Sequence, residues 1–333
     1  MMKEPKIFAK WLENQGFRVE ETASSFWYEA SYRVYQAFPY HWLIEPTENE
    51  LSRFLIQKKA IALRYSTPVE STAGCISYHV TYDEPHYSLE NLDRRSRQNI
   101  RKGLRKFSVR KISFERLADE GWLLQKDTQE RQGRKGDFDV ESWRKRCLTA
   151  EQLPGFEAWG AIVGNRLAAS LLTFQMGDCC EMLSQQCHSD FLRDRVNNAL
   201  AYVVTETMIE RPAIKSVFYT LQSLDAPESV DEFKFRMGYR AVPVRQRVVF
   251  HPWTESFVDR YGQGIVTKMR QKYADNQLYS RAEGMLRFYR QGNMPLSKQE
   301  WPDCLSAYTE LYLQDKSDHK YLNVHEGDLQ LGG

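Results

Sequence analysis

The most regular part of the chain is a series of apolar runs in its second half. Three such runs occupy residues 158–163, 167–176 and 179–188. They are separated only by the pairs Gly164-Asn165 and Gly177-Asp178, and two-residue linkers that contain glycine are typical of tight hairpin turns. The pattern therefore predicts a meander of three antiparallel strands across residues 158–188.

The residues after this meander predict an alternation of helices and strands. Apolar positions recur every third or fourth residue across 196–208, which is the spacing of one helix face. A strand is expected at 216–221. Ser229 and Glu232 then have the spacing of a capping box, and they predict a short helix that Gly238 ends.

The first part of the chain combines short strands with short helices. Aromatic and polar residues alternate from 26 to 38 as in one strand, and apolar runs at 60–65 and 75–82 indicate two more. Thr47 and Glu50 have capping-box spacing before an apolar stretch, which predicts a helix start. Mixed α/β structure is therefore expected here.

A strongly basic segment follows. Residues 94–111 hold nine Lys or Arg residues and no acid. Apolar or small residues three or four apart predict a helix with one packed and one basic face; they are Leu89, Leu92, Ser96, Ile100, Leu104 and Phe107. Most charge runs are solvated helix faces, but the absence of acids also favours a phosphate-bearing partner. A strand at 109–114 and helices at 119–132 and 140–152 come next.

Overall composition narrows the class of protein. Of the 333 residues, 42% are hydrophobic and the formal net charge is +2, so we expect a folded core and not a surface that coats nucleic acid. No apolar run approaches the roughly 20 residues of a membrane helix, and the first residues lack the apolar core of a secretory signal. A cytoplasmic protein is therefore expected. The six cysteines fit neither a disulfide framework nor a common zinc finger, so reduced thiols and no metal are expected.

Two short motifs resemble a known superfamily. Residues 97–102 have the sequence RQNIRK, which is similar to the R-x-N-I-R-K helix of the FemAB-like and BioF2-like branch of the GCN5-related N-acetyltransferase (GNAT) superfamily. Residues 233–239 have the sequence FKFRMGY, which resembles the F-K-x-x-x-G-F/Y element of the same branch. Meander, helix, strand, helix and strand is also the order of elements in the GNAT fold.

The resemblance covers residues 85–250 and implies the fold class. We expect an α/β (α+β) protein with a GNAT-like mixed, largely antiparallel sheet flanked by helices, whose last strand lies at 242–250. FemAB-like proteins carry two such units, and the first is often degenerate. The expected division is a truncated, degenerate N-terminal GNAT-like unit at 1–87, an acyltransferase domain at 88–250 and a helical C-terminal extension at 251–333.

The resemblance also implies an enzyme, a GNAT-like N-acyltransferase. The first expectation is transfer from acyl-CoA, a co-substrate rather than a permanently bound cofactor, to an amine of a small molecule or cell-envelope precursor. The second is a FemAB-like transferase that takes aminoacyl groups from aminoacyl-tRNA. The third is a GNAT-like module without catalysis that binds nucleic acid or protein through the basic helix.

The donor phosphates are expected at the start of the helix that follows the meander. Typical GNAT proteins place a glycine-containing loop there, and its N–H groups hold the pyrophosphate with the help of the helix dipole. Here both glycines are missing, but Arg193 and Arg195 supply charge, and Asn197 and Asn198 tolerate unusual backbone conformations. These four residues are the predicted cofactor-binding set. The missing glycines favour aminoacyl-tRNA or a non-catalytic module, whereas the near-neutral charge disfavours tRNA.

Acyl transfer to an amine needs a group that accepts a proton and a group that stabilises an oxyanion. The predicted bases are Glu181 and His188 on the third meander strand and Asp225 in the loop after the strand at 216–221. The alternative for Glu181 and His188 is an ordinary outward-facing strand residue, and for Asp225 an ordinary loop acid.

Three residues are predicted to bind substrate. Arg101 and Lys234 lie in the two motifs that resemble the FemAB-like branch, and we expect both to face one cleft and contact an anionic part of donor or acceptor. Tyr219 alternates with apolar neighbours on its strand, so a core position is the alternative for this residue.

Overall fold

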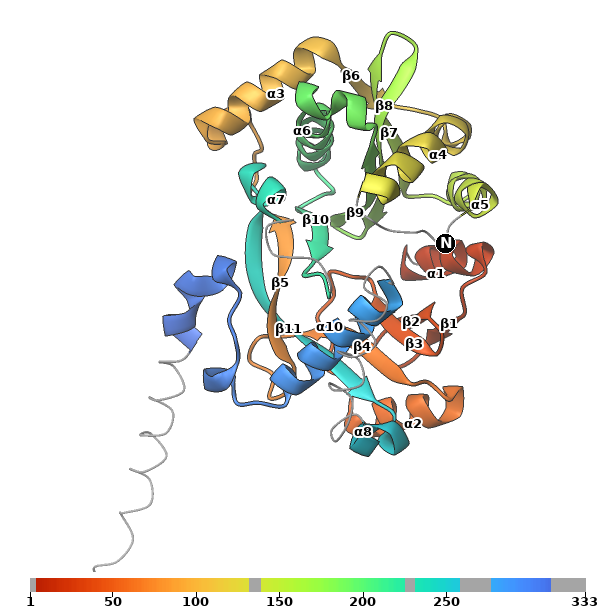
Figure 1. The fold of residues 1–333 in the computed structure, drawn as a ribbon, viewed down its shortest axis with the longest axis vertical. Coiled ribbons are helices and arrows are strands. Elements are labelled where there is room, and N and C mark those ends of the chain that lie inside the picture. Colours follow the sequence, from red (N-terminus) through yellow and green to blue (C-terminus); the bar gives the residue numbers. More distant parts are fainter. Residues whose placement is uncertain (1–3, 132–138, 225–230, 258–276, 313–333) are drawn as a thin grey trace, which may run out of the picture.

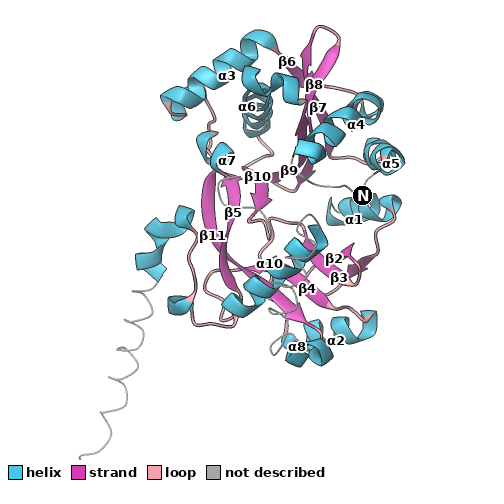
Figure 2. Cartoon of the chain, viewed as in Figure 1, coloured by secondary structure: helices cyan, strands magenta, loops and turns pink. Residues whose placement is uncertain are grey.

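A computed structural model of the protein describes residues 4–131, 139–224, 231–257 and 277–312. In these residues, eleven strands form one sheet in the order β1-β2-β3-β4-β11-β5-β10-β9-β8-β7-β6 (Figure 1, Figure 2). The strands are β1 (Val19–Glu21), β2 (Phe26–Ser31), β3 (Val34–Phe38), β4 (Ala62–Thr67), β5 (Cys75–Tyr82), β6 (Ser108–Lys111), β7 (Phe156–Val163), β8 (Arg166–Met176), β9 (Cys179–Cys187), β10 (Ser216–Leu221) and β11 (Arg240–Phe250). Neighbouring strands are antiparallel except in the pairs β3–β4 and β9–β10. The predicted mixed, largely antiparallel sheet is confirmed.

Helices flank the meander strands on both sides. Near β7–β9, α3 (Arg94–Lys106) and α6 (Val196–Ile209) lie on one side, and α4 (Phe114–Arg131) and α5 (Val140–Glu151) lie on the other (Figure 1). The other α-helices described are α1 (Glu4–Gln15), α2 (Glu48–Lys58), α7 (Glu232–Arg236), α8 (Pro252–Phe257) and α10 (Gln277–Gly292). Short 3-10 turns occur at Leu89–Asn91, Ser189–Asp194, Leu296–Lys298 and Asp303–Leu305.

β7, β8 and β9 form the predicted antiparallel meander. At the two turns, Gly164 and Gly177 have φ angles of 57° and 62°, a left-handed conformation that favours glycine. β8 is buried along almost its whole length because helices cover both faces of the sheet here. The glycine linkers thus fix the hairpins, and the apolar runs between them form the core of this part of the molecule.

The N-terminal strands differ from the prediction in one place. Residues 26–38 form a hairpin of β2 and β3 and not one strand. At its turn, Arg33 has a φ angle of 54°, and Oε1 of Glu29 accepts its backbone N–H at 2.6 Å. A side-chain acceptor therefore stabilises this tight turn, and the sequence has no glycine to mark it.

Two helix ends lie where the sequence predicts them, the start of α2 at Thr47 and the end of α7 before Gly238. Oγ1 of Thr47 accepts the N–H of Glu50 at 3.2 Å, so α2 begins where its capping residue predicts. The reciprocal half of the box does not form, because the Glu50 carboxylate accepts hydrogen bonds from the backbone and hydroxyl of Ser24. Gly238 follows α7 with a φ angle of 85°, as expected of a helix stop, while Ser229 lies outside the described residues.

β5 and β11 join the N-terminal strands to the meander. β11 pairs with β4 on one side and β5 on the other, and β5 also pairs with β10. The sheet is therefore continuous, and the domain boundaries at 87 and 250 remain predictions. In the expected helical extension, α10 packs on this sheet with Phe288 and Tyr289 against Val248 and Phe250.

Two general features complete the fold. None of the helices in the described ranges is both long enough and apolar enough to cross a bilayer. All six cysteines are free thiols, and five of them are buried.

Candidate functional site

β9 and β10 start side by side and then part. Their parallel pairing joins three residue pairs, of which the last is Phe218 with Glu181. Beyond this point β10 pairs only with β5, and β9 pairs only with β8. The register of β9 against β8 also shifts by one residue at Leu183. Such a bulge bends a strand and is common beside active sites.

Side chains from several elements bridge the diverging strands. The Tyr219 hydroxyl on β10 donates a hydrogen bond to Oε1 of Gln185 on β9. Its ring meets the Tyr239 ring edge-on at a centroid distance of 5.1 Å. Burial raises the pKa of Tyr219, and the charge of Asp231 raises it further. The phenol is therefore protonated, and aromatic rings with polar tips occupy the space where β9 and β10 part.

Lys234 lies against the same tyrosine. Its Nζ is 5.2 Å from the centre of the Tyr219 ring and forms an ion pair with Asp231 at the start of α7. The Lys234 and Asp231 side chains are 14% and 8% exposed, so the pair is largely withdrawn from water. The second carboxylate oxygen of Asp231 accepts the Tyr78 hydroxyl of β5 at 2.8 Å. Three elements thereby hold one ammonium group beside the place where β9 and β10 part.

Glu181, a predicted base, is fully buried at the last paired position of β9 and β10. Its Oε1 accepts the backbone N–H of Tyr40 at 2.9 Å and lies 2.8 Å from Nδ1 of His41. Burial lowers the pKa of His41, but hydrogen bonds to Cys179 and Glu181 outweigh this effect and raise it to about 10. Glu181 therefore anchors the loop after β3 to β9. Its Oε2 is buried without a hydrogen-bond partner in the described part of the chain.

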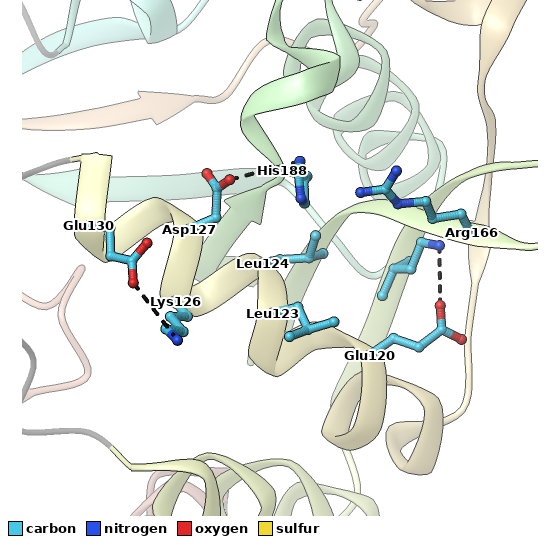
Figure 3. Close-up of a pocket in the computed structure, with 9 residues that line it drawn as sticks. Glu120, Leu123, Leu124, Lys126, Asp127, Glu130, Arg166 and His188 are labelled. Atoms are coloured by element: carbon cyan, nitrogen blue, oxygen red, sulfur yellow. Dashed lines mark hydrogen bonds and ion pairs between the residues drawn. The ribbon is translucent and has the colours of Figure 1, made fainter.

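His188, the second predicted base, borders a cavity of about 330 Å³ between α4 and the start of β8 (Figure 3). Its Nδ1 accepts the N–H of Asp190 at 3.2 Å and lies 3.8 Å from the Asp127 carboxylate. Burial raises the pKa of Asp127, but hydrogen bonds from Ser189 outweigh this and lower it. None of the residues that line this cavity bridges β9 and β10. Asp225, the third predicted base, lies outside the described residues.

The predicted phosphate-binding arginines lie at the start of α6, which α3 crosses. Arg193 and Arg195 are exposed, and the carbonyl of Arg193 accepts Nζ of Lys102 at 2.8 Å. A Cβ atom on Gly103 of α3 would lie 2.7 Å from the carbonyl oxygen of Arg195 and 2.8 Å from Cβ of Ala199. The close approach requires glycine, and it covers part of the first turn of α6.

The two predicted asparagines contact sulfur atoms inside the protein. Nδ2 of Asn197 donates to Sγ of Cys187 at 3.2 Å, and Nδ2 of Asn198 donates to Sδ of Met237 at 3.5 Å. Oδ1 of Asn197 is buried and has no hydrogen-bond partner among the residues that the structure describes. This oxygen is therefore available to a donor group of a ligand or water at the start of α6.

α3 packs along one face and exposes arginines on the other. Ser96, Ile100 and Gly103 are buried, whereas Leu104, predicted on the packed face, is 37% exposed because Gly103 makes the contact with α6. Lys106 pairs with Asp194. Six arginines of the segment have no carboxylate partner within the described ranges: Arg94, Arg95, Arg97, Arg101, Arg105 and Arg110. Arg97 is half-buried and the other five are exposed, so the segment presents a row of unpaired positive charges to solvent.

Arg101 and Lys234 occupy different environments. Arg101 is exposed on α3, whereas Lys234 is half-buried beside Asp231. Their contact with one anionic ligand remains a prediction. Asp231 and Tyr78 are absent from the predicted site. The i, i+3 spacing of Asp231 and Lys234 is a signal for the first, but Tyr78 is 153 residues from Asp231 and has none.

Comparison with solved structures identifies the fold. FemX aligns over 75% of this chain and 92% of its own, with a TM-score of 0.52 and 10% identity. The C-terminal domain of a protein described as a lysylphosphatidylglycerol synthetase from Agrobacterium fabrum aligns over 73% of this chain and 87% of its own, with a TM-score of 0.50 and 10% identity. At this identity the likeness shows the fold alone, and the predicted GNAT-like fold is confirmed. No family model and no curated protein matches the sequence.

Proposed function

We propose that this chain is a transferase that moves an acyl or aminoacyl group from an activated carrier to an amine. The observation that carries the proposal is the Lys234–Asp231 ion pair against Tyr219, where β9 and β10 part. An ammonium group withdrawn from water stabilises a developing negative charge more strongly than it does in water. The name lysylphosphatidylglycerol synthetase describes the joining of a lysyl group to a lipid, and this agrees with the proposed reaction class.

In this proposal the donor carbonyl lies beside Tyr219 with its oxygen toward Lys234. The amine attacks the carbonyl carbon, the π electrons move to oxygen, and the Lys234 ammonium stabilises the oxyanion. The proton that the amine loses passes to water. Collapse of the intermediate breaks the bond to the carrier, whose oxygen or sulfur takes up a proton as it leaves. Glu181 shares its face of the sheet with Phe218 and His41, whereas Tyr219 packs with Met182 and Tyr239 on the other face. His188 is not suited as the base either, because its Nδ1 already accepts a hydrogen bond.

The shape of α3 favours aminoacyl-tRNA as the carrier. The helix has 13 residues, and at 1.5 Å per residue its arginine face is about 20 Å long. A nucleic acid presents phosphates along such a length, whereas one pyrophosphate does not. The first turn of α6, where a pyrophosphate would bind, is partly covered at Gly103. The resemblance to FemAB-like proteins implies the same carrier.

Acyl-CoA is the second candidate, and one observation favours it. Arg193 and Arg195 are exposed at the start of α6, where the helix dipole also attracts anions. For either carrier, the proposed acceptor is an amine of a small molecule or of a cell-envelope precursor.

Binding measurements separate the two carriers. Filter binding with bulk aminoacyl-tRNA is expected to show an affinity that falls steeply with salt, because each neutralised phosphate releases counterions. The variant Arg97→Gln/Arg101→Gln/Arg105→Gln is expected to bind more weakly and to lower the salt slope by about one for each arginine that no longer neutralises a phosphate. Calorimetry with acetyl-CoA is the parallel experiment, with Arg193→Ala/Arg195→Ala as its variant. Saturable acetyl-CoA binding that this variant abolishes would establish the second candidate, and binding of neither carrier would refute both.

A further inference from the structure

The end of the molecule that holds α2 and α8 exposes several large apolar side chains. Trp253 on α8 is 89% exposed, Tyr32 at the β2–β3 turn is 68% exposed, and Ile61 before β4 is 37% exposed. Backbone hydrogen bonds make these segments neighbours: the N–H of Ile61 donates to the carbonyl of Arg33 at 2.7 Å, and the N–H of His251 donates to the carbonyl of Ile61 at 2.9 Å. The His251 and Trp253 rings are 6.0 Å apart. Three neighbouring backbone segments thus each expose one large apolar side chain, at the end of the molecule that holds α2 and α8 and lies opposite α3 (Figure 1).

Unpaired cations accompany these side chains. The Arg33 guanidinium lies 5.2 Å from the centre of the Tyr32 ring, and Arg53 and Lys59 are exposed on α2 and just after it. None of these three cations has a carboxylate partner among the residues described. The acids of β2, α2 and α8 are all engaged by other groups: Glu29 by Arg18, Glu48 by Arg247, Glu50 by Ser24 and Glu255 by Tyr289. This end of the molecule therefore carries a surplus of positive charge.

We propose that this end of the molecule docks on the surface of an anionic lipid bilayer. The docking patch consists of Tyr32, Ile61 and Trp253, with Arg33, Arg53 and Lys59 as its cations. Trp and Tyr side chains combine an apolar ring with a polar tip and partition to the boundary between acyl chains and headgroups. The unpaired cations attract lipid phosphates at the same depth. Folded proteins that stay monomeric in water rarely gather large apolar side chains in this way.

The arrangement favours a bilayer over a protein partner. The apolar side chains come from three separate segments and have cations beside them, which suits a fluid surface that needs no shape complementarity. The proposal does not depend on the transferase function, since no residue of the docking patch belongs to the site at β9 and β10. It does require a control for α3, whose exposed arginines also attract anionic lipids.

Vesicle co-sedimentation of the full chain tests the proposal. We expect binding to vesicles of phosphatidylcholine with phosphatidylglycerol, and little binding to phosphatidylcholine alone. The variant Tyr32→Ser/Trp253→Ser is expected to bind about tenfold more weakly or worse, because two large apolar groups no longer leave water. Leu123→Ser is the matched control, because Leu123 is 63% exposed on α4 outside the docking patch, and it is expected to bind like wild type. Both side chains changed in the first variant are exposed, so its fold is expected to persist.

Quenching of tryptophan fluorescence by brominated lipids shows which part of the protein contacts the bilayer. Quenching of wild-type tryptophan fluorescence is expected to persist in Arg97→Gln/Arg101→Gln/Arg105→Gln and to disappear in Trp253→Phe, which still sediments with vesicles. The proposal is overturned if Tyr32→Ser/Trp253→Ser sediments like wild type, or if Trp253→Phe is quenched as strongly as wild type. Lipid-independent dimerisation that Tyr32→Ser/Trp253→Ser abolishes would overturn it as well, and would assign the patch to a second copy of the chain.

Discussion

Lys234 and the arginines of α3 carry the same charge in opposite environments. Lys234 is only 14% exposed, paired with Asp231 and in contact with an aromatic ring. The α3 arginines are exposed, except for the half-buried Arg97, and have no carboxylate partners in the described chain. A buried charge needs its partner, because an uncompensated charge away from water is costly. Exposed charges hardly affect folding, and salt screens them over about 10 Å at 0.1 M. The first environment suits orientation of a reacting group, and the second suits attraction of a polyanion.

The largest effect is expected when the buried pair is broken. Asp231→Ala leaves the Lys234 ammonium without a carboxylate and should lower the free energy of unfolding by about 3–5 kcal/mol. Urea denaturation measures this change. The double variant Asp231→Leu/Lys234→Met removes both charges and is expected to recover much of the loss. An unchanged unfolding free energy in Asp231→Ala would show that Lys234 is not buried as described.

His41 extends the comparison to a second ion pair, in which Glu181 is buried and the His41 side chain is 20% exposed. Its pKa rises from 6.5 in the unfolded chain to about 10 in the fold, so the protonated form is the one that stabilises the native state. This contribution is complete below pH 6.5 and is lost as the pH rises toward 10, with a slope of at most about 1.4 kcal/mol per pH unit. Unfolding free energies of wild type and His41→Gln across this range check it. The gap between the two proteins should narrow with rising pH, and a constant gap would contradict the assignment.

A smaller effect is expected where α3 meets α6. Gly103→Ala places a methyl group 2.7 Å from a carbonyl oxygen and 2.8 Å from another Cβ, so the helices must move apart. The expected cost is about 1–3 kcal/mol, the usual range for overpacking. Thermal unfolding measures it, with the neighbouring and partly exposed Leu104→Ala as the control. Equal melting temperatures for both variants would mean that the helices do not cross at Gly103.

The smallest effect on stability is expected on the basic face of α3. Arg97→Gln/Arg101→Gln/Arg105→Gln should change the unfolding free energy by no more than about 0.5 kcal/mol, as is usual for surface substitutions. Its binding of bulk tRNA should nevertheless weaken in low salt and converge on wild type in high salt. A large loss of stability in this variant would show that the α3 arginines, like Lys234, contribute to folding, and would contradict their assignment as surface charges.

Local pattern predicts local structure in this chain, and tertiary contacts explain the exceptions. Gly164 and Gly177 mark the meander because the left-handed turns require glycine. The turn at Arg33 carries no such mark, since the carboxylate of Glu29 stabilises it. Gly103 is a poor helix former by propensity, and its role becomes clear only when α6 lies against it.

In the candidate site, too, some residues can be predicted from local sequence and others depend on tertiary contacts. Glu181, Tyr219 and Lys234 come from sequence patterns and lie where β9 and β10 part, although their roles in catalysis remain predictions. Their hydrogen-bond partners come from distant segments. Tyr78 donates to Asp231, which pairs with Lys234, and His41 donates to Glu181 from 140 residues away. Sequence spacing does not encode contacts of this kind, because the order of strands in the sheet brings them together.

The most direct test of the proposed transferase is single-turnover transfer by Lys234→Arg. Arginine keeps the charge and the ion pair with Asp231, so the melting temperature and the affinity for tRNA should stay close to wild type. The reacting carbonyl would meet a displaced charge, and a misplacement of about 1 Å costs about 100-fold in rate. Transfer from bulk aminoacyl-tRNA charged with labelled amino acids, into an amine fraction of a cell extract, is the reaction to follow. A rate at least about tenfold below wild type, with folding and binding intact, is the predicted result. Transfer at the wild-type rate would contradict the role assigned to Lys234.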